Sequence, residues 1–284
     1  MNYYDTSGKG ILYIVATPIG NLEDITFRAA RILNDVDIVA AEDTRHSRKL
    51  LSHLGISKPL TSYFDHNKDL KGSYIIQKLT EGLSVALISD AGTPCISDPG
   101  FQLVRDAVAA GIRVVPIPGP SAFLAALSAS GLRTDSFTFE GFLPNRQGKR
   151  RAKLIALKEE HRLLIFYESP NRLLASMTDM LEVLGDRRVV VAREVTKVHE
   201  EFLRGALSEI IARLNIRQIK GEVLILVSPA IREVKAEDFS FHDLLAKYLT
   251  SQKLSLKDAV QRVTLETGVK RSKIYEEALR IIKR

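Results

Sequence analysis

The chain has 284 residues, 45% of them hydrophobic, which is enough apolar surface for two main lobes and a small additional module. Its single cysteine, Cys95, excludes an intramolecular disulfide and a zinc site built from several cysteines, so a reducing compartment, the cytoplasm, is expected. The formal net charge is +7, and residues 251–284 hold nine Lys or Arg against four Asp or Glu, a surplus of +5. That surplus indicates a polyanionic partner, although a solvated helix face would have the same composition.

The first half of the chain alternates between strand-like apolar runs and helix-like segments, beginning with the run at residues 11–16. Further runs at residues 37–41, 85–89 and 114–117 follow, and the four runs lead into the loops TPIGN, EDTR, DAGTP and PGPSA. This order predicts an α/β fold with a parallel sheet covered by helices. The four loops are expected to gather at the carboxyl ends of the strands, where open sheets bind ligands. No apolar run approaches the roughly 20 residues that cross a bilayer, and the start MNYYDTSGKG does not resemble a secretory signal.

The pattern changes near residues 136–145, where we place a domain boundary. Beyond it, LLIFY, RRVVVA and GEVLILV indicate strands of a second α/β lobe, with helices near residues 171–184 and 207–214. IREVKAEDF is typical of a linker, and residues 240–284 are helical in pattern, with a turn at Thr267 and Gly268. The predicted organisation is an extension at 1–10, lobes at 11–135 and 136–230, and a linker with a helical module at 231–284.

The segment SDAGTPCISDPG, residues 89–100, has a composition that a simple chain reversal does not need. Gly92 permits a close backbone approach, and Asp90 can accept hydrogen bonds from a ligand. We therefore assign residues 90–93 to ligand contact. Asp98 and Pro99 fit the cap and the first position of the helix that follows, and we assign them to that structural role.

The other loops have no phosphate-binding signature. A P-loop is absent, and no G-x-G-x-x-G follows the first strand, so a cofactor held without a phosphate cradle is expected. In AAEDTR, residues 40–45, Asp43 or Thr44 could cap a helix and Glu42 could pair with Arg45, yet the nearby loops favour a functional role. No metal site is expected, since four candidate ligands lack metal-binding spacing and are interpreted as structural or surface residues: His46, His53, His66 and Cys95.

Two basic segments fit contact with phosphate groups. NRQGKRRAK, residues 145–153, follows an apolar FLP, although charge runs are more often solvated faces. The tail segment at residues 255–279 has a helix-turn-helix pattern, and a helical hairpin packed on the body is an equally good interpretation. The candidate RNA-binding residues are Arg146, Lys149, Arg150, Arg151, Lys153, Lys270, Arg271 and Lys273.

These motifs together resemble the ribosomal RNA small-subunit methyltransferase I family, within the tetrapyrrole-methylase-like superfamily. TPIGNLEDIT, AAEDTR, SDAGTPCISDPG, PGPSA, FEGFLP, FYESPNR and REVTKVHEEF follow one another in the family's order and lie within residues 10–228. Each motif alone would be weak evidence, but their joint order is specific. The basic tail resembles the family's C-terminal helical module.

The resemblance implies two α/β lobes with S-adenosylmethionine in the cleft between them, a homodimer, and 2′-O-methylation of a cytidine ribose in the decoding region of 16S ribosomal RNA. TPIGN replaces the glycine-rich first loop of the tetrapyrrole enzymes, which argues against a tetrapyrrole substrate. Carried over from the family, the cofactor-binding residues are Pro18, Asp90, Ala91, Gly92, Thr93, Ile96, Ser121, Ala122, Tyr167 and Glu222.

The expected reaction requires an acceptor for the ribose proton. Asp43 or Glu42 could accept it, and Arg45 could steady a neighbouring phosphate. Two other classes of function remain open at this point. A methyltransferase acting on a tetrapyrrole or a protein would need neither basic segment, and a non-catalytic RNA-binding protein would not need the loop at residues 89–100.

Overall fold

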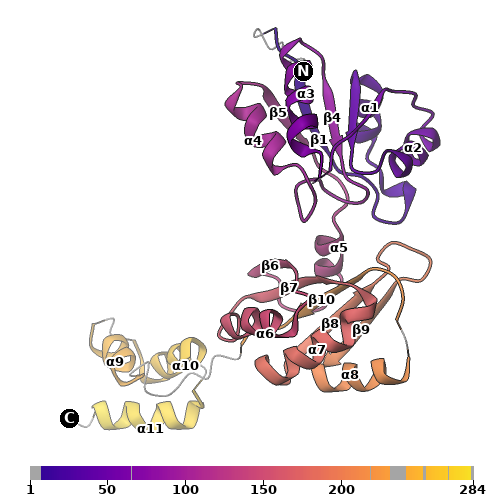
Figure 1. Ribbon diagram of the computed structural model, residues 1–284. Helices are drawn as coiled ribbons and strands as arrows, with labels where there is room; N and C mark the ends of the chain where they lie inside the picture. Colours follow the sequence, from indigo (N-terminus) through magenta and orange to yellow (C-terminus); the bar gives the residue numbers. More distant parts are fainter. Residues whose placement is uncertain are drawn as a thin grey trace. The chain divides into compact units, whose positions relative to one another are not determined.

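The computed structural model describes residues 8–64, 66–217, 219–230, 241–251, 254–267 and 269–282. It divides into two compact units, Met1–Ala230 and Ile231–Arg284, and the first unit contains two five-stranded sheets (Figure 1). Most of the predicted N-terminal extension, the predicted linker IREVKAEDF at residues 231–239 and Gly268 of the predicted turn lie outside the described residues.

The first sheet is wholly parallel, with the strand order β3-β2-β4-β1-β5. Its strands are β1 (Ile11–Val15), β2 (Ile38–Ala41), β3 (Leu60–Ser62), β4 (Val85–Ile88) and β5 (Arg113–Ile117). Every residue of β2 and β4 is buried, as expected where helices cover both faces of a sheet. The four predicted strands are confirmed. The edge strand β3 was not predicted, because its three half-buried residues form no apolar run.

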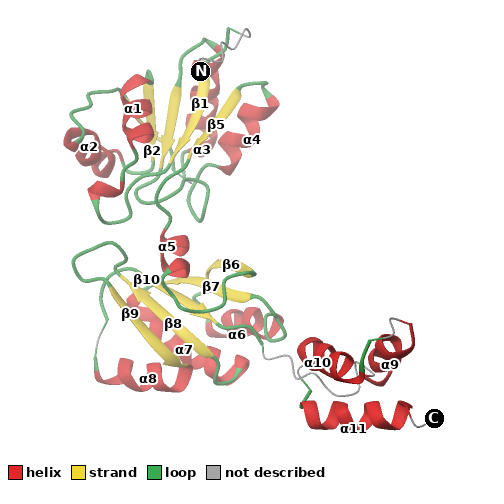
Figure 2. Cartoon of the chain, turned by 180° about the vertical axis from the view of Figure 1, so that it is seen from behind, coloured by secondary structure: helices red, strands yellow, loops and turns green. Residues whose placement is uncertain are grey.

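Helices cover both faces of this sheet (Figure 2). α1 (Phe27–Asp35) and α2 (Thr44–His53) pack on one face, and α3 (Lys68–Thr80) and α4 (Phe101–Ala109) pack on the other. Ala29, Ile32 and Leu33 form the buried face of α1. The short 3-10 helix η1 (Leu22–Asp24) and α5 (Ala122–Ser128) complete this part of the chain.

The second sheet is mixed, with the order β6-β7-β10-β8-β9, and only β6 and β7 pair in parallel. Its strands are β6 (Phe137–Phe142), β7 (Leu163–Glu168), β8 (Arg188–Arg193), β9 (Glu201–Ala206) and β10 (Val223–Val227). α6 (Gln147–Ala156), α7 (Pro170–Leu184) and α8 (Leu207–Ile216) lie on one face, and α5 lies on the other (Figure 1). The α/β fold with two lobes is therefore confirmed.

The C-terminal unit has a core of its own. Its elements are α9 (Phe241–Ala246), the π-helix η2 (Lys247–Ser251), α10 (Leu256–Thr267) and α11 (Arg271–Ile282). In this core α11 packs on α10, and the buried residues are Leu245, Tyr248, Ala259, Val260, Val263, Ile274 and Ala278. Lys270, Arg271 and Lys273 are exposed at the start of α11. None of the described helices has the length and apolar character that crossing a membrane requires.

The basic segment on α6 is largely paired, which corrects part of the predicted RNA-binding set. Arg150 is buried, and its Nε and Nη2 atoms each lie 2.7 Å from Oδ2 of the buried Asp179 on α7. A guanidinium group enclosed in this way cannot reach a phosphate. Arg151 pairs with Glu182 at 2.6 Å, and the Nζ atom of Lys153 donates to the carbonyl oxygen of Glu140 at 2.7 Å.

The buried pair leads to a prediction about stability. Asp179→Ala leaves the Arg150 charge buried without its partner, so the free energy of unfolding should fall by about 3–5 kcal/mol. Glu182→Ala removes only the exposed partner of Arg151 and should cost about 1 kcal/mol or less. Urea unfolding of the two variants measures this difference, and equal losses would show that burial of the pair contributes nothing.

Candidate functional site

Four loops that follow strands of the first sheet are tied together by hydrogen bonds. Thr17 and Gly92 exchange two backbone hydrogen bonds of 2.9 and 3.0 Å, which join the loops after β1 and β4. The Thr93 hydroxyl donates to the carbonyl oxygen of Pro120 at 3.2 Å, in the loop after β5. The backbone N–H of Asp43, after β2, donates to Oδ1 of Asp90 at 3.0 Å. The predicted convergence of the four loops is therefore confirmed.

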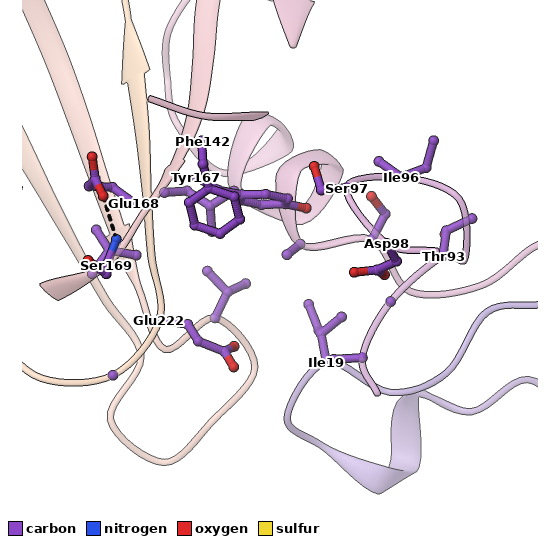
Figure 3. A pocket seen from close by; sticks show the side chains of 18 of the residues that line it. Ile19, Thr93, Ile96, Ser97, Asp98, Phe142, Tyr167, Glu168, Ser169 and Glu222 are labelled. Atoms are coloured by element: carbon purple, nitrogen blue, oxygen red, sulfur yellow. Dashed lines mark hydrogen bonds between the residues drawn. The ribbon is translucent and has the colours of Figure 1, made fainter. Parts of the chain in front are cut away.

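A cavity of about 340 Å³ opens beside these loops and takes residues from both lobes (Figure 3). This volume is within the usual range for a small-molecule site. The first lobe and α5 contribute Ile19, Ala91, Gly92, Thr93, Ile96, Ser97, Asp98, Ser121 and Ala122. The second lobe contributes Phe142, Tyr167, Glu168, Ser169, Pro170, Val195, Gly221, Glu222, Val223 and Leu224.

Eight of the ten residues proposed for cofactor binding line this cavity, and two do not. Pro18 and Asp90 border a separate hollow of about 30 Å³, together with His46 and Ser47. Asp90 accepts the N–H of Asp43, so it orders the neighbouring loop instead of facing the cavity. Gly92 does line the cavity, but its N–H and carbonyl are both bonded to Thr17, and its φ of +81° is the left-handed conformation that favours glycine.

The assignment of Asp98 to a helix cap is wrong. α4 begins at Phe101 and its N-cap is Gly100, whose φ is +149°. Ser97 and Cys95 also have left-handed backbone angles, with φ of 64° and 70°, so the chain turns before the helix starts. The turn leaves Asp98 half-buried on the cavity wall. Burial raises the pKa of its carboxyl and the charge of Asp90 adds to this, while a hydrogen bond from Ser89 opposes them.

The second lobe adds aromatic rings and further carboxylates. The Tyr167 ring lies 5.5 Å from that of Phe142 and 5.1 Å from that of Phe139. Its hydroxyl points toward the loop that carries Ser97 and Asp98 (Figure 3). Burial, helped by the charge of Asp98, raises the pKa of Tyr167 to about 12, so the phenol stays protonated. The cavity lining contains three carboxylates and no Lys or Arg.

The predicted catalytic group at residues 42–45 lies outside this lining. Asp43 caps α2 by accepting the N–H of Arg45 at 2.8 Å, and it pairs with the Arg45 guanidinium at 2.8 Å. Hydrogen bonds from the side chain and backbone of Arg45 lower the pKa of Asp43 to about 2. Such a carboxylate is a weak proton acceptor, because Arg45 already forms an ion pair with it.

A loop after β8, in which no site residue was predicted, reaches the first lobe. The Nζ atom of Lys197 lies 3.0 Å from Oε1 of Glu194 and 3.2 Å from Oε2 of Glu222. Val195 of this loop lines the cavity, and Lys197 packs so closely on Gly20 that a Cβ atom there would lie 2.3 Å from its Cγ. The left-handed φ angles of Glu194 and Thr196, 49° and 70°, give no signal in the sequence because neither is a glycine.

Comparison with known proteins places this arrangement in a family. Residues 11–211 match the family model "Tetrapyrrole (Corrin/Porphyrin) Methylases". Among solved structures, a cobalt precorrin-4 methyltransferase has a TM-score of 0.61 at 18% identity, over 80% of this chain and 98% of its own. Diphthine synthase has a TM-score of 0.63 at 14% identity, over 77% and 90%. The fold is that of this class of methylases.

Curated relatives define the family more narrowly. The ribosomal RNA small subunit methyltransferase I of Halalkalibacterium halodurans is 46% identical over 278 residues, which cover 96% of each chain. The protein of the same name from Pseudomonas aeruginosa is 48% identical over 273 residues, covering 95% of this chain and 97% of its own. The chain therefore belongs to the ribosomal RNA small subunit methyltransferase I family, as the motifs predicted.

The bond between Asp90 and Asp43 can be tested by hydrogen exchange. In Asp90→Ala the Asp43 amide loses a charged acceptor, a bond of about 1.5–3 kcal/mol, so its exchange should accelerate by about tenfold or more. Asp90→Asn keeps an oxygen that can accept and should retain most of the protection. The Ala29 amide, bonded to Thr26 in α1, is the internal reference. Unchanged Asp43 exchange in Asp90→Ala would mean that the loops are not joined through this side chain.

Proposed function

We propose that this chain is an S-adenosylmethionine-dependent methyltransferase of small-subunit ribosomal RNA, and that it modifies the 2′-oxygen of a cytidine ribose in the decoding region. The observation that carries the proposal is the cavity between the two lobes, built from the family's motif loops and lined by carboxylates without Lys or Arg. By the same family resemblance, we propose a cytoplasmic homodimer with the domain limits 11–135, 136–230 and 231–284.

The cavity residues fit the proposed cofactor in charge and shape. S-adenosylmethionine supplies, when bound, a methyl group on a positively charged sulfur. Glu222 offers negative charge to such a ligand, and the rings of Phe142 and Tyr167 offer faces that attract both cations and flat ring systems. The proposed cofactor-binding residues are Ala91, Gly92, Thr93, Ile96, Ser121, Ala122, Tyr167 and Glu222.

The described cationic surface supports an RNA substrate. Arg146 at the N-cap of α6 and Lys149 in its first turn are exposed, and no ion pair is found for either among the described residues. Phe142, just before α6, is 56% exposed and also lines the cavity, so it can stack on a nucleotide that enters. A ribose in a base-paired helix cannot reach an enclosed methyl group, so a flipped or single-stranded nucleotide is the expected substrate.

The direct experiment follows a labelled methyl group. Incubation of the protein with labelled S-adenosylmethionine should label assembled small subunits or their ribosomal RNA, and should leave uroporphyrinogen and protein unlabelled. A 2′-O-methyl group removes the hydroxyl that attacks the adjacent phosphodiester, so the modified position should resist alkaline cleavage. Label on uroporphyrinogen or on ribosomal protein would refute the RNA assignment, and label in RNA that leaves every position sensitive to alkali would refute the ribose assignment.

The proposed RNA contacts predict how binding depends on salt. Replacing Lys270, Arg271 and Lys273 with serine removes up to three cations that can neutralise phosphates. The slope of log affinity against log salt should therefore flatten by about 0.7 for each phosphate that is no longer neutralised. Arg146→Ser with Lys149→Ser tests the other segment in the same way. Arg28→Ser with Arg31→Ser, on the exposed side of α1, is the control for loss of charge alone. Equal slopes in all these variants would assign both basic segments to solvated surface.

A further inference from the structure

Methylation of a ribose hydroxyl needs a proton acceptor beside the reacting oxygen, and the cavity offers three carboxylates. Glu168 is fully engaged. Its Oε1 accepts the N–H of Ser169 at 2.8 Å and lies 3.3 Å from Nε of Arg172, while its Oε2 accepts the hydroxyl of Ser176 at 2.6 Å. The Glu168 side chain has no exposed surface, so its carboxylate is a buried anchor for the start of α7.

Glu222 is held by a cation. Its Oε2 lies 3.2 Å from Nζ of Lys197, and 72% of its side chain is exposed to solvent. The Lys197 ammonium group already occupies this carboxylate and most of the side chain faces solvent, so Glu222 is placed to hold a cation and not to take a proton from an enclosed substrate. Asp43 lies outside the cavity lining, and its carboxylate is likewise already paired with a cation, that of Arg45.

Asp98 differs from these groups in its surroundings. It lines the cavity, it is half-buried, and no Lys or Arg pairs with it among the described residues. In Figure 3 its carboxylate lies on the first-lobe wall, and the Tyr167 hydroxyl points to the same wall from the second lobe. A carboxylate without a cation partner, in a partly closed pocket, is the group in this site best able to take up a proton.

We infer that Asp98 is the catalytic base, the group that accepts the hydroxyl proton of the substrate as the methyl group is transferred. The inference rests on the proposed function. The transfer forms one C–O bond and breaks one S–C bond, the electron pair of the broken bond stays on sulfur, and one proton is left over. An Asp98 carboxylate oxygen takes that proton and later releases it to solvent at the cavity mouth.

The groups around Asp98 determine the direction in which its pKa is shifted. Burial, with the charge of Asp90 in the same loop, raises the pKa of Asp98 above its ordinary value of 3.8, and the Ser89 hydroxyl at the end of β4 works against this. The thiol of Cys95 and the phenol of Tyr167 on β7 both have raised pKa values, so both are neutral at pH 7. Glu222, before β10, is the remaining charged group in the lining beside the buried Glu168. The rate should therefore fall as the pH drops through the raised pKa of Asp98.

The test compares Asp98→Asn with Asp106→Asn, which removes an equal charge from the exposed side of α4. Single-turnover methylation at saturating RNA and S-adenosylmethionine should slow by about 10²–10⁴-fold in Asp98→Asn and stay unchanged in Asp106→Asn. The wild-type rate should fall about tenfold per pH unit on the acid side, and this limb should vanish in Asp98→Asn. Calorimetry should show S-adenosylmethionine affinity within about threefold of wild type in both variants.

Two measurements separate this inference from the proposed function. A titration of the Asp98 carboxyl carbon by NMR in the free protein should give a pKa above 3.8, and it needs no methylation. A normal pKa there, or an undiminished rate in Asp98→Asn, would overturn the role of Asp98 while leaving the methyltransferase function intact. A rate that falls only as cofactor affinity falls would make Asp98 a binding residue. Removal of the acid limb by Asp43→Asn instead would identify Asp43 as the base.

Discussion

The two backbone hydrogen bonds between Thr17 and Gly92 are the constraint on which the site depends. They join the loops that leave β1 and β4, two neighbouring strands whose ends would otherwise carry independent loops. Gly92 can make both bonds because its φ of +81° costs glycine little. The bonds from Thr93 to Pro120 and from Asp43 to Asp90 then bring in the loops after β5 and β2. One wall of the cavity is thus ordered by the protein's own backbone and side-chain hydrogen bonds.

Among the described residues, the acidic groups that line the cavity lie apart from the basic groups that have no ion pair. The cavity lining contains only acidic ionisable groups apart from Tyr167, whereas the cations of α6 and α11 that have no ion pair lie on exposed helix turns. This separation suits a reaction between a cationic methyl donor and a polyanionic substrate, because each reactant meets a surface of opposite charge. It also explains why Arg150 does not belong with Arg146 and Lys149. Arg150 is committed to Asp179 inside the second lobe.

Much of the fold was predictable because the periodicity of the apolar residues is clear in the buried strands. β2, β4 and β10 are buried at every position and read as uninterrupted apolar runs, whereas the edge strands β3 and β9 are half-exposed and read as loops. The loops that form the site were also predictable, from four strand ends in succession.

The roles of single residues within these loops were not predictable from the sequence. Asp98 was predicted to cap a helix, because nothing in ISDPG shows that Ser97 has a left-handed backbone conformation or that the helix begins only at Phe101. Arg150 offered a weak signal, since it lies four residues before the buried Leu154 and so on the inward face of α6.

The contact between Gly20 and Lys197 makes the residues allowed at these two positions depend on each other. Gly20 has no left-handed backbone angle, so its own conformation would accept any residue. The obstacle is the Lys197 side chain, whose Cγ and Cε would lie 2.3 and 3.0 Å from a Cβ at position 20. A longer side chain at position 20 and a long aliphatic stem at position 197 therefore exclude each other. Relatives that keep Lys197 between Glu194 and Glu222 are free to vary at position 20 only if they rebuild this loop, so the two sites should change as a pair across the family.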